Sequence, residues 1–151
     1  MKILIKRSNS NSILPYKGSK DAACYDVIAD EIIYSDRNKV VVKLGFHTKI
    51  PDNYKGLIVP RSSFTQKGWV MQNSPAQIDS DYRGEWMIKF EGIPNKSTSM
   101  GILDCPKFPY KKGDRVAQIY FERVDEPLWE EVDTLDQTER GSGGFGSTGV
   151  Y

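Results

Sequence analysis

The apolar residues of this chain come in short runs, and this feature constrains its fold most. Six runs are rich in β-branched and aromatic residues and are bounded by Gly, Pro, Asn or Asp, namely 2–5, 40–50, 57–59, 69–71, 86–90 and 115–124. Such runs between turn residues are typical of β-strands. No long segment has the 3.6-residue periodicity of an amphipathic helix, and only 62–67 is predicted to form a short helix.

These runs predict an all-β protein, a jelly roll or β-sandwich, because a single open sheet of this size would leave apolar faces uncovered. The length of 151 residues fits one domain, which we place at 1–135. Residues 136–151 hold five glycines and few large apolar groups. They cannot offset the entropy lost on ordering, so we expect a mobile, Gly-rich C-terminal arm of the same domain.

Residues 92–112 interrupt the strand pattern. This segment contains three prolines and shows little alternation of apolar and polar residues. We therefore expect a long surface excursion between two strands.

Charge and composition exclude several classes of function. The net charge is +1, so no global field draws the chain to nucleic acid or to an anionic membrane. The apolar run at the N-terminus is too short for a signal peptide, and no run reaches membrane-spanning length. We expect a cytoplasmic protein, or one of the host cytoplasm or nucleus if the source is viral, without direct nucleic-acid or membrane contact.

Cysteine and histidine are too sparse for common catalytic or metal sites. Cys24 and Cys105 have no partner at metal-ligand spacing and are expected to be reduced, and His47 is the only histidine. Hydrolytic triads and His-based zinc sites are therefore weak candidates. Hydrolysis here would depend on carboxylates, arginine and an oxygen-bound metal ion.

The first chemical signal is the Gly-rich stretch 140–149. It matches G-x-G-x-x-G, but no strand precedes it and no helix can follow, and the lysine of a P-loop is absent. Closely spaced glycines still let backbone N–H groups converge on phosphate oxygens, with Arg140, Ser147 and Thr148 as further donors. Phe145 would supply a face for a base. A disordered terminus is the alternative.

Two further signals lie in the middle of the chain. Residues 77–85 form an acid-rich turn between apolar runs; Arg83 and Phe90 stand where a calcium loop needs acids, so a β-hairpin with acids at its tip is favoured. Residues 60–63, Pro-Arg-Ser-Ser, follow a strand-like run and could clamp phosphate. A solvated hairpin tip is the alternative for the first signal.

Taken in order, five segments closely resemble the five motifs of the homotrimeric dUTPase family, the deoxyuridine triphosphate pyrophosphatases. These segments are 22–26, 60–63, 78–84, 113–118 and 140–149. The resemblance covers nearly the whole chain, and five motifs in sequence are a specific signal. It implies a jelly-roll subunit of the β-clip type in a homotrimer, with each active site assembled from all three chains. The implied reaction is Mg²⁺-dependent hydrolysis of dUTP to dUMP and pyrophosphate, which limits uracil in DNA and supplies dUMP for dTMP synthesis.

The resemblance also implies roles for individual residues. Asp79 would be the base that orients water, Asn73 and the hairpin backbone would read uracil, and Tyr82 would sit beneath the deoxyribose and exclude a 2′-hydroxyl. Arg61, Ser62 and Gln118 would hold phosphates, and Asp26 would reach the metal through water. In the arm, Arg140 would bind the γ-phosphate and Phe145 would cover uracil. Ser63, Ile78, Gly146, Ser147 and Thr148 complete the implied substrate-binding set.

The chain also departs from the family pattern. Cys24 and Ala76 stand where the family usually has Gly, and Pro75 is unusual, so base selectivity is the property most affected. Two alternatives stay open, a dCTP deaminase-like enzyme of the same fold and a trimeric, nucleotide-gated interaction protein. The intact 78–84 segment and the Gly-rich arm argue against the deaminase.

Overall fold

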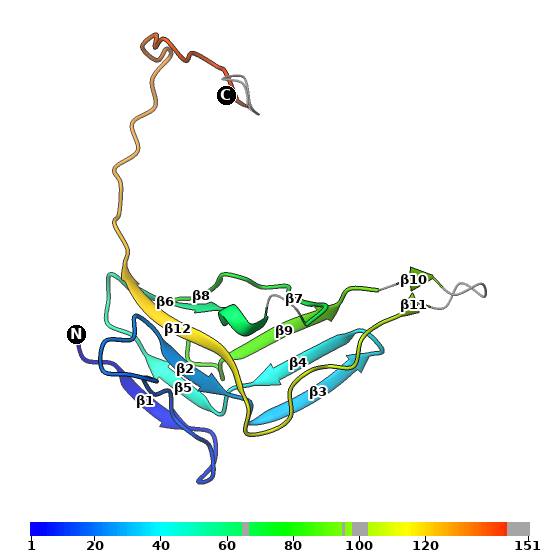
Figure 1. Ribbon diagram of the computed structural model, residues 1–151. Helices are drawn as coiled ribbons and strands as arrows, with labels where there is room; N and C mark the ends of the chain where they lie inside the picture. Colours follow the sequence, from blue (N-terminus) through cyan, green and yellow to red (C-terminus); the bar gives the residue numbers. More distant parts are fainter. Residues whose placement is uncertain (65–66, 95, 98–102, 145–151) are drawn as a thin grey trace.

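The computed structural model describes residues 1–64, 67–94, 96–97 and 103–144. Within this part, twelve strands and one short 3-10 helix, η1, follow one another (Figure 1). Their bounds are β1 Leu4–Arg7, β2 Tyr25–Ile28, β3 Glu31–Asp36, β4 Lys39–Lys43, β5 Phe46–Lys49, β6 Tyr54–Val59, η1 Ser62–Phe64, β7 Trp69–Met71, β8 Ala76–Ile78, β9 Met87–Gly92, β10 Lys96–Ser97, β11 Leu103–Asp104 and β12 Arg115–Arg123. The all-β prediction is confirmed.

Two four-stranded antiparallel sheets form the body of the molecule (Figure 1). One sheet has the order β2-β12-β6-β8 and the other β3-β4-β9-β7. A small β1-β5 sheet lies beside them, and β10-β11 forms a separate hairpin. Many sheet neighbours are far apart in sequence, as in a jelly roll. The predicted sandwich is therefore confirmed.

The core lies on the inward faces of these strands. In β4 and β9 the side chains alternate between buried and more exposed positions, so Val40, Val42, Ile88 and Phe90 face the interior. This is the period of two that a pleated strand imposes. Trp86, just before β9, is fully buried, and its Nε1 donates a hydrogen bond to Thr48 Oγ1 at 3.1 Å.

The predicted run 40–50 is two strands rather than one. Gly45 separates β4 from β5 with φ +75°, and a Cβ there would lie 2.8 Å from atoms of Asp30 and Ser12. Only glycine tolerates both constraints. The edge strand β3 and the three-residue β8 were absent from the predicted strands, because β3 is mostly exposed and β8 is very short.

The segment 92–112 is only partly the surface excursion that we expected. β10 and β11 project from the body as a hairpin (Figure 1). Phe108, however, is 4% exposed and packs against Trp69 and Phe90, with ring centroids 4.9 and 5.3 Å apart. The expectation is therefore wrong for the second half of the segment. The short helix expected at 62–67 is η1, with residues 65–66 outside the described part.

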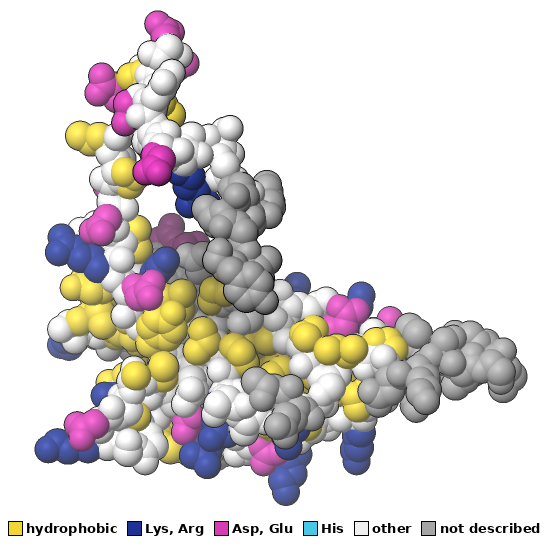
Figure 2. All heavy atoms as spheres, turned by 45° about the horizontal axis from the view of Figure 1, so that its top comes forward, with side chains coloured by type: hydrophobic (Ala, Val, Ile, Leu, Met, Phe, Trp, Pro, Cys, Tyr) yellow, Lys and Arg dark blue, Asp and Glu magenta, His cyan; other side chains and the backbone are white. Residues whose placement is uncertain are grey.

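The chain leaves the body after β12 as a long extension, residues 125–144 (Figure 1). The last backbone hydrogen bond before it, among the described residues, is the one that the Val124 N–H donates to Asn53 O at 2.8 Å. Leu128, Trp129 and Leu135 are 100, 92 and 84% exposed. Acidic and hydrophobic side chains alternate along the extension (Figure 2). Residues 125–135, which belong to the domain as bounded at 1–135, lie beyond the last strand, and that domain boundary stays a prediction.

No helix in the described ranges is long and apolar enough to cross a membrane.

Gly56 of β6 gives a stability prediction. A Cβ at this position would lie 2.5 Å from Trp86 Cη2, a contact that the hydrogen-bonded, buried ring cannot easily relieve. Gly56→Ala should cost about 1–3 kcal/mol through overpacking and lower Tm by about 3–10 °C in a thermal melt. Gly144→Ala is the control, because a Cβ there has no neighbour within 4 Å among the described residues. Equal Tm values for the two variants would contradict the prediction.

Candidate active site

Four predicted site residues line one cavity of about 230 Å³ between the β8–β9 loop and β4. They are Asn73, Ile78, Asp79 and Tyr82, and the remaining lining residues are Val41, Gln77, Glu85, Met87 and Lys89. The β8–β9 loop explains most of this grouping, because β8 ends at Ile78 and β9 begins at Met87. We call this space the hairpin cavity, after the segment 77–85 that was expected to form a β-hairpin. That expectation is wrong, because β8 pairs with β6 in one sheet and β9 pairs with β4 and β7 in the other, so the acid-rich segment is a loop that joins the two sheets.

Asn73 lies in the segment before β8, and its side-chain amide forms hydrogen bonds with the backbone of β9. Its Oδ1 accepts a hydrogen bond from the Lys89 N–H at 3.1 Å, and its Nδ2 donates to Met87 O at 3.4 Å. The amide is therefore fixed in orientation, with one further N–H and one lone pair left for a ligand. The Ser74–Pro75 peptide bond next to it is cis.

Tyr82 closes one side of the hairpin cavity. Its hydroxyl donates a hydrogen bond to the Glu85 backbone carbonyl at 3.1 Å. Its ring lies so close to Gly84 that a Cβ there would be 2.2 Å from the phenolic oxygen. Glycine at position 84 therefore permits the observed position of the Tyr82 ring.

A second group of predicted residues meets around Asp26, which is 4% exposed. Arg61 Nε lies 3.2 Å from Asp26 Oδ1, Arg115 Nη1 lies 3.2 Å from Oδ2, and Gln118 Nε2 donates to Oδ1 at 3.3 Å. A buried carboxylate with two guanidinium partners is compensated in charge. The cluster leaves a net positive charge for an anion. We call these four residues the Asp26 cluster.

The strand register brings the Asp26 cluster together. Gln118 of β12 pairs with Asp26 of β2 on one side and with Val59 of β6 on the other. A register shift between Arg115 and Ala117 adds one residue to β12. Because side chains alternate across a strand, this bulge turns Arg115 to the same face as Gln118.

The turn after β6 adds the two predicted serines. Ser62 and Ser63 are exposed in η1, and Phe64 anchors that turn by stacking on Tyr110 at 5.9 Å. The Tyr110 hydroxyl and Arg61 Nε are buried without a hydrogen-bond partner among the described atoms, so the Arg61–Asp26 contact is an ion pair with poor alignment. Burial raises the pKa of the Tyr110 phenol, which keeps this donor protonated.

The two groups lie apart in a single chain. Ile78 pairs with Gly56 of β6, so Asp79 lies at the level of Lys55, whereas the Asp26 cluster lies at the level of Val59. Four residues of strand separate these levels by about 13 Å. In one chain Asp79 and Gln118 therefore belong to two separate groups of side chains.

The arm forms the third group. Arg140 is exposed, and its Nε donates a hydrogen bond to Gly143 O at 2.9 Å, so it contacts neither of the other groups. Phe145, Gly146, Ser147 and Thr148 lie outside the described residues.

Several residues of these sites were not among the predicted site residues. Arg115 belongs to a motif that we identified, but simple alternation puts it on the face opposite Gln118, and only the bulge reverses this. Glu85 ends the acid-rich turn 77–85 but lies one residue beyond the 78–84 segment, so no individual role was predicted for it. Val41 and Lys89 come from other strands, and the residues alone do not predict that they line this cavity.

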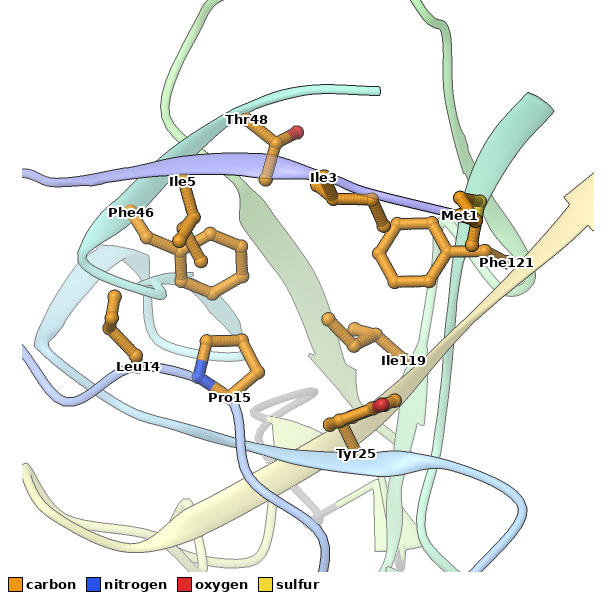
Figure 3. Close-up of a pocket in the computed structure, with 10 residues that line it drawn as sticks. All are labelled: Met1, Ile3, Ile5, Leu14, Pro15, Tyr25, Phe46, Thr48, Ile119 and Phe121. Carbon is orange, nitrogen blue, oxygen red and sulfur yellow. The ribbon is translucent and has the colours of Figure 1, made fainter. Parts of the chain in front are cut away.

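A larger, apolar cavity of about 330 Å³ contains none of the predicted site residues (Figure 3). It is lined by Met1, Ile3, Ile5, Leu14, Pro15, Tyr25, Phe46, Thr48, Ile119 and Phe121. We give the hairpin cavity greater weight as the active site, because chemistry needs its polar groups and the larger cavity offers mainly hydrocarbon.

Known proteins resemble this chain over nearly its whole length. The family model for dUTPase matches residues 10–149. The deoxyuridine 5'-triphosphate nucleotidohydrolase of Swinepox virus is 40% identical over 147 residues, covering 97% of this chain and 95% of that protein. The enzyme of the same name from Mus musculus is 39% identical over 144 residues, covering 95% of this chain and 82% of that protein.

Solved structures match as well. A mutant dUTPase of Staphylococcus bacteriophage 80alpha with dUpNHpp has a TM-score of 0.80 at 25% identity, and the match covers 99% of both chains. A mutant dUTPase of phage phi11, described with a structural Mg(II) ion, has a TM-score of 0.73 at 21% identity, covering 91% of this chain and all of that one. The fold is thus that of the jelly-roll nucleotide hydrolases. The chain belongs to the dUTPase family.

Proposed function

We propose that this chain hydrolyses dUTP to dUMP and pyrophosphate. The observation that carries the proposal is the convergence of Asn73, Ile78, Asp79 and Tyr82 on one cavity. The relatives from Swinepox virus and mouse carry the name of this activity. The reaction would limit uracil incorporation into DNA and supply dUMP for dTMP synthesis. Location inside the cell, in the cytoplasm or in a host nucleus, stays a prediction.

In this proposal the hairpin cavity takes the nucleoside. Its volume of about 230 Å³ is small and suits a base and sugar better than a whole triphosphate. The fixed Asn73 amide and the neighbouring backbone read uracil, and the Tyr82 ring leaves no room for a 2′-hydroxyl. Asp79, exposed at the cavity wall, holds the attacking water and accepts its proton.

The Asp26 cluster and η1 take the phosphates. Arg61, Gln118 and the hydroxyls of Ser62 and Ser63 are donors close to one another, and guanidinium groups pair well with phosphate oxygens. Such donors lower the energy of the charge that develops as the P–O bond breaks. Arg140 binds the γ-phosphate and Phe145 covers uracil as the arm closes, with Gly146, Ser147 and Thr148 as further contacts.

Magnesium fits this site as an ion carried by the triphosphate. The described part of the chain has no cluster of three or more His, Cys, Asp or Glu residues that could cage a metal. Asp26 accepts hydrogen bonds from Arg115 and Gln118, which leaves part of its acceptor capacity for a metal-bound water. Mg²⁺ characteristically keeps several waters and binds through one or two carboxylates and substrate phosphates. When bound, it supplies positive charge to the phosphate oxygens.

A homotrimer with shared active sites would bring the hairpin cavity of one chain to the Asp26 cluster of another. Because about 13 Å of strand separates the level of Asp79 from that of Gln118, another copy must bring its hairpin cavity to each Asp26 cluster. The exposed apolar residues of the extension, 125–144, also support association. The extension exposes Leu128, Trp129, Val132 and Leu135, which a single chain leaves in water. Burying such a row and the open apolar cavity of Figure 3 would favour assembly.

Subunit mixing tests the shared site. Arg61→Ala and Asp79→Asn should each abolish most turnover in a pure trimer. Trimers reassembled from equal amounts of both should regain roughly a quarter of the parental activity, because one site in four draws both intact residues from different chains. Activity is measured as pyrophosphate release, with trimer mass checked by light scattering. No recovery in verified mixed trimers would contradict a site built across subunits.

An assay with four nucleotides tests the reaction itself. Pyrophosphate release is measured with dUTP, dCTP, dTTP and UTP in the presence of Mg²⁺, and dUTP should be strongly preferred. Ammonia release from dCTP would instead support the deaminase, since fold alone does not define the reaction. Tight binding of dUTP without pyrophosphate release would support the nucleotide-gated interaction protein.

A further inference from the structure

The loop that carries Tyr82 is held on its outer side by a polar network that reaches it from β1 and β5. His47 Nδ1 lies 2.9 Å from the Arg83 backbone oxygen, and His47 Nε2 lies 3.3 Å from Ser8 Oγ. Ser8 Oγ donates a hydrogen bond to Glu85 Oε1 at 2.9 Å. We call Ser8, His47 and Glu85 the loop anchor. It joins the N-terminal strand to the loop over 77 positions of sequence.

The backbone of Gly45 also forms hydrogen bonds with the loop anchor. Its N–H donates to Glu85 Oε1 at 3.0 Å, and its carbonyl accepts the Ser8 N–H at 2.8 Å. A Cβ at Gly45 would collide with Asp30 and Ser12, so the backbone of Gly45 is held in place by close packing. The Glu85 carboxylate therefore rests on a rigid part of the molecule.

The donors and acceptors of the loop anchor define its geometry. A carbonyl oxygen can only accept, so His47 carries a proton on Nδ1 and donates it to Arg83 O. This bond and the Glu85 contacts hold the backbone of residues 83–85. The Tyr82 hydroxyl in turn donates to the Glu85 carbonyl. A shift of Glu85 would therefore move the Tyr82 ring, and Glu85 itself lines the hairpin cavity.

We propose that Ser8 and His47 are positioning residues for nucleotide binding. Neither residue lines the hairpin cavity. Through their contacts with Glu85 and Arg83, however, they determine the position of the Tyr82 ring, which forms one wall of the cavity. Their effect should fall on substrate affinity and on discrimination between deoxyribose and ribose. This inference rests on the proposed placement of the sugar against Tyr82.

His47→Leu and His47→Asn test the proposal. Leucine removes the donor to Arg83 O, whereas asparagine can place an N–H near the position of Nδ1. His47→Leu should raise KM for dUTP about 3–10-fold, the equivalent of one lost hydrogen bond, with kcat within about twofold. Its preference for dUTP over UTP, taken as a ratio of kcat/KM values, should fall by a similar factor. His47→Asn should recover most of both losses.

A matched serine pair provides the control. Ser8→Ala should raise KM in the same direction as His47→Leu. Ser35→Ala removes an equally exposed hydrogen bond, the one to Lys39 O at 3.3 Å on the edge strand β3, and should change nothing. A His47→Leu variant with lower Tm but parental KM and selectivity would overturn the proposal. An Asn variant no better than the Leu variant would do the same.

Amide hydrogen exchange separates this proposal from the proposed function. Residues 79–86 of the ligand-free protein should exchange faster in His47→Leu than in the parent, whatever reaction the protein catalyses. Unchanged exchange would overturn the loop anchor. Absence of pyrophosphate release by the parent would contradict the proposed function alone.

Discussion

Asp79→Asn should lower kcat for dUTP hydrolysis by about 10²–10⁴, the usual contribution of a general base. Asparagine keeps the size of the side chain and removes its affinity for a proton. Asp79 lines the hairpin cavity and is exposed, so the substitution disturbs no buried contact. Binding of a nonhydrolysable dUTP analogue should stay within a few-fold of the parental value. Steady-state kinetics and calorimetric binding measure the two effects.

The control for Asp79→Asn is Asp81→Asn. Asp81 is an exposed acid in the same loop and does not line the hairpin cavity. Its substitution removes the same charge without removing the base and should leave kcat within about twofold. Turnover by Asp79→Asn within a few-fold of the parent, in an assembly of the same mass as the parent's, would show that Asp79 is no base.

Deleting residues 140–151 should lower turnover strongly and leave the fold intact. Arg140 bonds only within the arm among the described contacts, and residues 140–144 are mostly exposed, so no strand loses a partner. Tm should therefore change little. The site would lose the γ-phosphate partner and the stacking face proposed for Phe145. Because these contacts form as the arm closes, we expect kcat to fall by about 10²-fold or more.

Binding of the product dUMP distinguishes an effect of this deletion on affinity from its effect on turnover. Affinity for dUMP, which lacks the γ-phosphate, should fall less than turnover. The substitution Arg140→Gln, which keeps the length of the arm, should reproduce a large part of the loss in kcat. Parental turnover by the deleted protein would show that the arm takes no part in catalysis.

Local patterns in the sequence were sufficient to predict several parts of this molecule. Alternation and turn residues predicted an all-β sandwich, and β7 lies where the run 69–71 predicted a strand. Asn73, Ile78, Asp79 and Tyr82 stand within ten positions of one another, so β8 and the loops on either side of it bring them together. Contacts of this kind are local, and the residues that make them are close in the chain.

Other features required the tertiary structure. Asp26 meets Gln118 across 92 positions of sequence, and Arg115 joins them only because a bulge reverses its face. Phe108 is buried although its neighbours in the sequence resemble a surface loop.

The loop anchor depends in the same way on the pairing of β1 with β5. Strand register and long-range pairing follow from how the two sheets pack over a common core, and a change of register by one residue would turn each of these side chains to the other face. Composition determines which segments become strands, and packing determines which strands become neighbours. The separation of Asp79 from the Asp26 cluster is a consequence of that packing.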